Sequence, residues 1–278
     1  MDTAKTQTFS SLLEDRYQDG TSADLEGPVN PVITTILRHK SHRKFLPRSL
    51  EPGTLEALVA AGSSASTSSL LQTWGIVAVQ NPERKAALAK LAGDQDFIRQ
   101  APLFLIFVAD LNRITKVIKN AGTKDTGLKN FDMFIMPTID CALVSQNVNV
   151  VAESLGLGTC YVGAVRNNCS KLCEMLNLPH RTVALFGMAI GYPDPSENVS
   201  IKPRFGISAV LHHEVWGDGD EQGHLESYNK ALGGFYEMQG KAGRQTWTHY
   251  MSHYFESGDL DGRERMREVV TERGFELA

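Results

Sequence analysis

Phe131-Asp-Met-Phe-Ile-Met-Pro-Thr-Ile-Asp140-Cys-Ala-Leu-Val-Ser-Gln-Asn-Val-Asn-Val150-Val-Ala-Glu-Ser-Leu155 is a long, mainly apolar segment with few charges. An apolar segment of this length with helical periodicity predicts a helix that is buried almost all round. Gly156 follows at the position where helices commonly end in a left-handed residue. The segment therefore predicts a central helix, and we expect the other helices and strands of the chain to pack around it.

Shorter apolar runs on either side of this helix predict the strands. The run 102–109, Pro-Leu-Phe-Leu-Ile-Phe-Val-Ala, has no polar residue and is typical of a strand buried on both faces. Further strands are expected at 74–79, 159–165 and 182–191, and a last short one at 207–211. Helical patterns are expected at 31–37, 55–62, 82–91, 169–178 and 225–238. The fold class is α+β.

Breaks in composition divide the chain into three parts. Residues 1–28 are polar and end in Gly27-Pro28, so they predict an extension that is disordered or lies across a partner subunit, with a short helix near Phe9. Residues 29–217 form the core. From 218 to 278 aromatic and charged residues alternate, which predicts a helical arm.

Charge and cysteine content exclude several classes of protein. The formal net charge is −4, so general attraction to nucleic acid is not expected. No apolar run approaches the roughly 20 residues of a membrane helix, and residues 1–5 lack a signal-peptide core. The four cysteines show neither a disulfide framework nor a zinc spacing. We expect an intracellular, cytoplasmic protein with reduced thiols and no bound metal.

Two basic segments and one hydroxyl-rich loop are the candidates for ligand binding. The stretch 38–44, Arg-His-Lys-Ser-His-Arg-Lys, is either a solvated helix end or an anion site. Lys202-Pro-Arg204 is the second basic element, and it is either a solvated pair of loop residues or an anion site. Both cations could face one anion, because residues two apart in an extended chain point to one side. The loop 63–69, Ser-Ser-Ala-Ser-Thr-Ser-Ser, precedes a predicted buried strand. With no glycine-rich phosphate motif, side chains would have to hold a phosphate here.

The order of these segments, together with Glu153-Ser-Leu-Gly-Leu-Gly158 and Tyr161-Val-Gly-Ala-Val-Arg-Asn-Asn168, resembles the nitroreductase / NAD(P)H:flavin oxidoreductase family. The likeness is closest to its oxygen-insensitive major nitroreductase and flavin reductase P branch. The resemblance implies a sheet with helices on both faces, in an intertwined homodimer that binds FMN at the subunit interface. It also implies an FMN-dependent NAD(P)H nitroreductase or flavin reductase.

Site residues follow from the resemblance position by position. The expected cofactor-binding residues are His39, Lys40, Ser41, Arg43, Thr67, Ser68, Ser69, Gln72, Gln95, Tyr161, Val162, Gly163, Ala164, Lys202 and Arg204. Lys40 stands where the family usually has arginine, which keeps the charge but loses the planar fork. Ser69, Leu70, Lys241 and Arg244 are expected to contact the nicotinamide or the second substrate. Lys241 and Arg244 are the only cations left where this branch has 2′-phosphate-binding arginines, so NADH is as plausible a donor as NADPH.

The resemblance also implies the reaction. Hydride passes from the nicotinamide to flavin N5 and then, with ping-pong kinetics, to a nitroaromatic, a quinone or free flavin. No protein residue acts as nucleophile. Two alternatives remain open: other flavin chemistry on the same fold, such as reductive dehalogenation or flavin fragmentation, and a flavin-binding protein without turnover.

Overall fold

The computed structural model describes residues 7–20, 25–217, 219–244 and 246–278. The chain forms two compact units. Unit 1 consists of residues 1–40 and 198–258, and unit 2 consists of residues 41–197 and 259–278. These limits differ from the sequence-based division at 28 and 217, because the N-terminal segment packs with part of the C-terminal segment.

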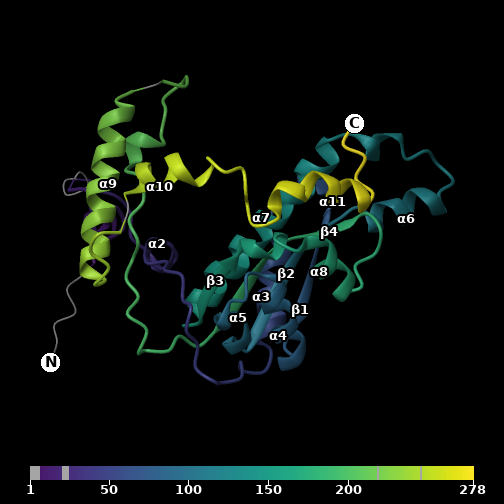
Figure 1. Ribbon diagram of the computed structural model, residues 1–278, viewed down its shortest axis with the longest axis horizontal. Coiled ribbons are helices and arrows are strands. Elements are labelled where there is room, and N and C mark those ends of the chain that lie inside the picture. Colours follow the sequence, from purple (N-terminus) through teal and green to yellow (C-terminus); the bar gives the residue numbers. More distant parts are fainter. Residues whose placement is uncertain (1–6, 21–24, 218, 245) are drawn as a thin grey trace. The chain divides into compact units, whose positions relative to one another are not determined.

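Unit 2 is built on a four-stranded antiparallel sheet (Figure 1). The strands are β1 (Trp74–Val79), β2 (Leu103–Asp110), β3 (Gly158–Val162) and β4 (Thr182–Gly191), in the order β1-β2-β4-β3. The two central strands, β2 and β4, are almost entirely buried. Unbroken apolar runs can form strands of this kind because both faces of the sheet are covered. The strands predicted at 74–79, 102–109 and 182–191 are confirmed. The strand predicted at 159–165 is confirmed only as far as Val162, because residues 163–166 form a 3-10 turn.

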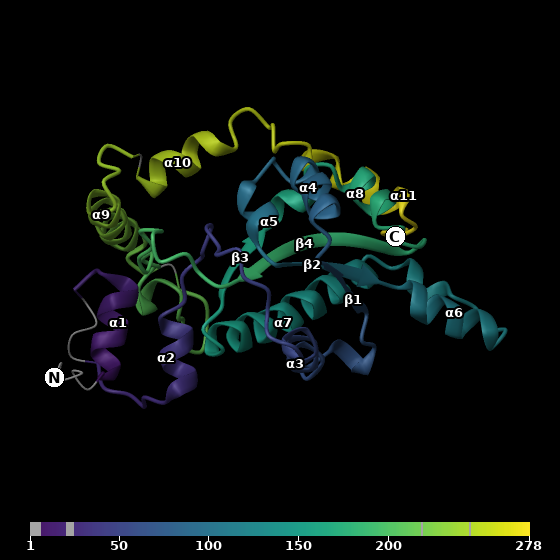
Figure 2. The same ribbon diagram turned by 90° about the horizontal axis from the view of Figure 1, so that it is seen from below.

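Helices cover both faces of this sheet, as predicted (Figure 2). One face carries α3 (Thr54–Ser63) and α7 (Asp132–Ser154), and the other carries α4 (Pro82–Leu91), α8 (Cys169–Met175) and α11 (Met266–Glu272). The remaining helices of unit 2 are α5 (Asp96–Gln100), α6 (Asn112–Asn120) and the 3-10 turns η1 (Ser68–Leu70), η2 (Thr126–Lys129), η3 (Gly163–Arg166) and η5 (Arg263–Arg265).

The central helix α7 contacts β1, β2 and β3, but it is not buried all round. Its inner face, which includes Val144 and Val148, is fully buried. On the outer face Ile135, Ile139 and Leu143 are 38%, 49% and 44% exposed, at a spacing of four residues. The prediction of all-round burial is therefore wrong for the single chain. The sheet and α3 cover one side of α7, while the apolar residues of the other side form a continuous exposed stripe.

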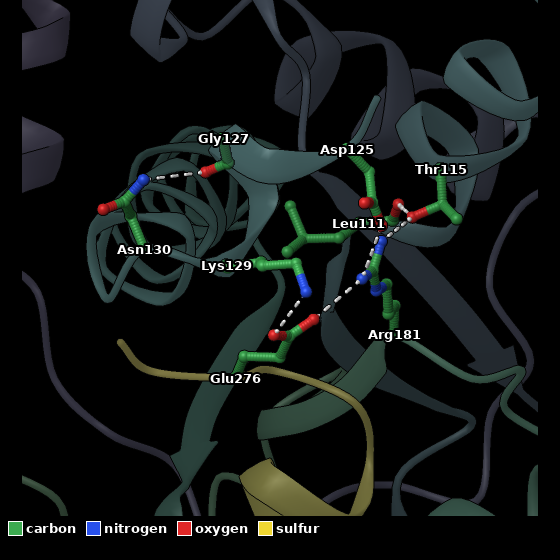
Figure 3. A network of polar contacts seen from close by, with 8 residues as sticks. All are labelled: Leu111, Thr115, Asp125, Gly127, Lys129, Asn130, Arg181 and Glu276. Atoms are coloured by element: carbon green, nitrogen blue, oxygen red, sulfur yellow. Dashed lines mark hydrogen bonds and ion pairs between the residues drawn. The ribbon is translucent and has the colours of Figure 1, made fainter. Parts of the chain in front are cut away.

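The C-terminal segment returns to unit 2 and is held by a polar network (Figure 3). The buried Arg181 donates to Asp125 Oδ2 at 3.0 Å and to Glu276 Oε1 at 3.4 Å. Lys129 Nζ lies 3.1 Å from the other oxygen of Glu276. Phe275, beside this network, is 1% exposed. The last residues are thus part of the core and not only a surface arm.

Unit 1 is helical. It contains α1 (Phe9–Tyr17), α2 (Pro31–Leu37), η4 (Ile207–Ala209), α9 (Glu221–Met238) and α10 (Trp247–Tyr254). The predicted strand at 207–211 is wrong, because this segment forms the 3-10 turn η4. The short helix predicted near Phe9 is present as α1, which packs against α2 of the same chain. Residues 1–6 and 21–24 of the predicted extension lie outside the described residues.

No helix in the described part of the chain has both the length and the apolar composition required to cross a bilayer. The four cysteines are free and buried, as expected.

Candidate functional site

The hydroxyl-rich loop is tied to the central helix by the buried carboxylate of Asp140. Asp140 Oδ1 accepts from Ser68 N at 3.0 Å, and Oδ2 accepts from Thr73 N at 3.2 Å and Thr73 Oγ1 at 3.0 Å. Asp140 and Thr73 are fully buried. Ser68 also donates through Oγ to Met136 Sδ at 3.0 Å. One carboxylate therefore closes the loop at both ends and leaves residues 69–72 as an arch.

The arch has an unusual backbone. Ser69, Leu70 and Gln72 have φ angles of 47°, 56° and 50°, in the left-handed region that disfavours residues with a Cβ. The cost is of order 1–3 kcal/mol for each such residue, and strain of this kind clusters at functional sites. Leu70 is 79% exposed, so burial of its side chain does not offset the strain. The three predicted ligand-contacting residues of this arch are thus held in exposed, strained positions.

A second set of predicted residues meets around Gly93. A side-chain carbon built at Gly93 would lie 3.6 Å from Ala164 Cβ, 3.7 Å from Gln95 Nε2 and 4.0 Å from Asn167 Nδ2. Gln95 donates to Ala92 O at 2.9 Å. The buried Oδ1 of Asn167 has no protein hydrogen-bond partner. A buried polar atom without a partner is costly, so a donor from a ligand or a water would fit at this oxygen.

Tyr161 and Val162 lie next to this set, on β3. The Tyr161 hydroxyl donates to Ser145 Oγ of α7 at 3.0 Å. Burial of the phenol raises the pKa of Tyr161 to about 12, although the hydrogen bond with Ser145 opposes this shift. Val162 is 1% exposed, so only its backbone is available to a ligand. Gly163 and Ala164 follow in η3 and are half-buried.

The end of the first basic stretch is fixed by acidic residues of unit 2. Ser41 forms an isolated bridge with Thr159, next to β3. Arg43 N donates to both carboxylate oxygens of Glu197, at 3.0 and 3.2 Å, and His42 Nδ1 lies 3.6 Å from Glu197 Oε2. The guanidinium of Arg43 is on an exposed residue. Glu197 therefore fixes the backbone while the Arg43 side chain stays available to an anion.

The other basic residues belong to unit 1. His39 and Lys40 are half-buried, whereas Lys202 and Arg204 are exposed. Arg204 Nη1 donates to the carbonyls of Lys202 and Pro203, both at 3.1 Å. The adjacent Phe205 packs in an aromatic group on Tyr228 and Trp247, with ring centroids 4.2 and 5.1 Å away.

Lys241 and Arg244, the predicted nicotinamide contacts, follow α9 in unit 1 and are exposed. The guanidinium of Arg244 stacks over the Tyr236 ring at 4.8 Å from its centroid. Such cation–π packing holds the side chain at the surface without satisfying its charge.

Within unit 2 the predicted residues form two sets on opposite edges of the sheet. The arch, residues 69–72, leads into the edge strand β1, whereas Tyr161 and Val162 lie on the other edge strand, β3. Three strand spacings of about 4.8 Å separate these edges, roughly 14 Å in total. The structure therefore brings Gln95 together with Ala164, but it does not bring the arch next to them in the same chain.

Three residues that contribute to these sets were not predicted as site residues: Asp140, Asn167 and Glu197. Asn167 stands in the quoted motif 161–168, which was the only sequence signal for it. Asp140 is a charged residue in an otherwise apolar helix, a pattern that indicates a buried polar contact but not its partner.

Comparison with known proteins places the chain in a family. Residues 36–192 match the nitroreductase family, and residues 202–278 match the nitroreductase family C-terminal domain. An FMN reductase (NADPH) of Bacillus subtilis is 34% identical over 252 residues, which cover 89% of this chain and 99% of that protein. An oxygen-insensitive NADPH nitroreductase of Salmonella typhimurium is 33% identical over 80% of this chain and 90% of its own length.

Comparison with solved structures gives the same family. The structure of the NfrA1 nitroreductase from Bacillus subtilis superposes with a TM-score of 0.83 and 33% identity, covering 89% of this chain and all of that one. The sequence match spans both family regions, and the structural match spans nearly the whole chain. The chain belongs to the nitroreductase family.

Proposed function

We propose that the protein is an FMN-dependent NAD(P)H oxidoreductase that reduces nitroaromatics, quinones or free flavin. The observation that carries this proposal is the group of Gln95, Ala164 and Asn167 around Gly93, with its unpartnered buried amide oxygen. A flat ring with a polar edge needs such an arrangement: apolar contact from Ala164 and hydrogen bonds from the two amides. The names of the relatives support the reaction type.

The residues present suit the remaining parts of FMN. The hydroxyls of Thr67, Ser68 and Ser69 match the hydroxyl-rich ribityl chain in hydrogen-bonding capacity. Lys202 and Arg204 would hold the phosphate, because an arginine can bind it through two parallel N–H groups. Positive charge from His39, Lys40 and Arg43 would attract the phosphate as well and would favour electron-rich atoms at the edge of the ring. When bound, FMN supplies hydride transfer through N5, and no side chain of this protein needs to act as a nucleophile.

We also propose that the active form is a homodimer. Two observations support this. The exposed stripe of Ile135, Ile139 and Leu143 on α7 is apolar and continuous, and such a stripe marks an interaction surface. The arch and the Tyr161 segment lie at opposite edges of one sheet. Pairing of two copies would let the arch of one chain complete the ring site of the other.

Absorbance spectroscopy tests the proposal. The purified full-length chain, reconstituted with FMN and desalted, should keep the absorption bands of bound flavin, and NADH or NADPH should bleach them without oxygen. A protein that retains no flavin would refute the proposal. A protein whose bound flavin neither donor bleaches would be a flavin carrier.

Steady-state rates with both donors and with a nitroaromatic, a quinone and free riboflavin then define the substrates. Double-reciprocal plots at several acceptor concentrations should be parallel, as ping-pong kinetics requires. Intersecting lines would show that both substrates bind before the reaction. Consumption of the bound flavin during turnover would indicate flavin fragmentation instead.

A further inference from the structure

A buried arginine of the N-terminal helix links the two basic segments of unit 1. Arg16 lies in the last turn of α1 and is 6% exposed. Its guanidinium donates to Leu37 O at 3.0 and 2.7 Å and to His39 O at 2.6 Å. It also donates through Nη1 to Lys202 O at 3.1 Å. One side chain thus binds the backbone of both segments that carry proposed phosphate-binding residues.

The end of α1 makes a second contact with the same segment. Gln18, the left-handed residue that ends the helix, donates through Nε2 to Ile201 O at 2.7 Å. Two side chains of α1 therefore hold two successive carbonyls, those of Ile201 and Lys202. A segment without regular secondary structure is fixed in this way just before Arg204.

The helix itself is well anchored in unit 1. Leu12 and Leu13 are 1% and 2% exposed, and Thr8 and Ser11 cap the first turn reciprocally. Burial of both leucines removes their apolar surface from water and so stabilises the position of the helix. This anchoring makes α1 a firm support for the guanidinium. Because α1 precedes the matched family regions, which begin at residue 36, the support is a feature of this chain beyond those regions.

We infer that Arg16 is a positioning residue for the phosphate of the bound cofactor. By fixing the carbonyls of His39 and Lys202, it sets the distance between the two basic segments and so aligns their side chains on one anion. The inference rests on the proposed function, since it presumes that FMN is the ligand.

Comparison of FMN with riboflavin isolates this role, because riboflavin lacks only the phosphate. Both flavins are titrated into the full-length apoprotein, and binding is followed by flavin fluorescence. In Arg16→Met we expect FMN affinity to fall about tenfold or more, since hydrogen bonds to charged groups contribute about 1.5–3 kcal/mol. Riboflavin affinity should stay within about twofold. Arg16→Lys should fall between wild type and Arg16→Met, because one ammonium cannot reproduce the planar fork that reaches both segments.

Arg273→Met is the matched control. Arg273 also donates to backbone carbonyls, those of Leu178, Pro179 and Thr182, but it does so in unit 2. It should change the melting temperature without changing the ratio of FMN to riboflavin affinity. Amide hydrogen exchange of residues 198–205 in the apoprotein gives a readout without flavin, and it should rise in Arg16→Met only.

The outcomes separate the inference from the proposed function. An unchanged FMN-to-riboflavin ratio in folded Arg16→Met overturns the role of Arg16 and leaves the proposed function intact. Wild type that binds neither flavin overturns the proposed function. If Arg16→Met does not fold, Gln18→Leu replaces it, because this variant loses the bond to Ile201 O and, besides it, only the local bond to Asp15 O. The ratio should then fall by about threefold, a loss of one neutral hydrogen bond, and an unchanged ratio would again refute the inference.

Discussion

Replacement of Asp140 by asparagine should release the arch of residues 69–72 from the central helix. The substitution keeps the shape of the side chain but turns one acceptor oxygen into an NH2 group. If the remaining oxygen keeps the bond from Ser68 N, the new amide group faces the N–H of Thr73, which then has no acceptor. Thr73 is fully buried, and an unsatisfied buried donor costs about 1–3 kcal/mol. We expect the free energy of unfolding to fall by about 2 kcal/mol.

Urea denaturation measures this loss, and amide exchange of residues 66–74 locates it. A local loss of about 2 kcal/mol corresponds to exchange that is roughly 30-fold faster. The KM for the second substrate should rise, because Leu70 and Ser69 would no longer be held in place. Val148→Ala is the control: it removes a fully buried side chain from the same helix and should cost about 2 kcal/mol without touching the arch. If both variants show equal exchange in residues 66–74, Asp140 does not hold the arch.

Three further outcomes follow from single contacts. Arg204→Ala should weaken FMN binding by more than about 1.5 kcal/mol, the loss of a charge-assisted bond, in a fluorescence titration; unchanged affinity would remove Arg204 from the site. Because the pKa of Tyr161 is raised from 10.0 to about 12, the unfolded chain loses this proton first, so stability should fall from pH 10 to 12. The loss of stability over this pH range should be smaller in Tyr161→Phe. If stability falls equally steeply with pH in both proteins, the pKa of Tyr161 is not raised. Gly274→Ala should lower the free energy of unfolding by about 2 kcal/mol or more, because φ is +94° there and a Cβ would overlap the His180 ring; an unaltered urea midpoint would contradict this packing.

The strands of unit 2 could be predicted because burial on both faces leaves a simple trace in the sequence. The runs that form β2 and β4 contain no charge over seven or more residues, and their short length with many β-branched or aromatic residues distinguishes them from a buried helix. The run 207–211 is short and has no partner strand, so hydrophobicity alone did not distinguish a strand from the turn η4. A strand needs a partner strand that can be distant in the sequence, and a pattern of five residues does not show whether such a partner is present.

Candidate ligand-binding residues could be proposed from the sequence alone only where they carry distinctive chemistry. Cations and hydroxyls stand out in a sequence and gave the segments 38–44 and 63–69, whereas the segment 161–168 came from the resemblance to the family. The groups that fix them do not stand out. Asp140 binds Thr73 and Ser68, which precede it by 67 and 72 positions in the sequence. Arg16 binds the carbonyl of Lys202, which follows it by 186 positions. A side chain that binds backbone carbonyls or amides places no constraint on the identity of its partner, so the sequence carries no sign of the pair.

The central helix explains why the single chain holds the proposed site in two pieces. Its inner face fixes the arch through Asp140 and reaches the opposite edge strand through the Ser145–Tyr161 bond. Both pieces are thus positioned by one rigid element, and the edge strands that carry them stay roughly 14 Å apart across the sheet. Motion within the chain would have to break the buried bonds of α7 to close this gap. Association through the exposed stripe of Ile135, Ile139 and Leu143 requires no such break, because it uses the face of α7 that the sheet leaves uncovered. A rigid chain with an apolar outer face therefore favours completion of the site by a second copy over closure of the first.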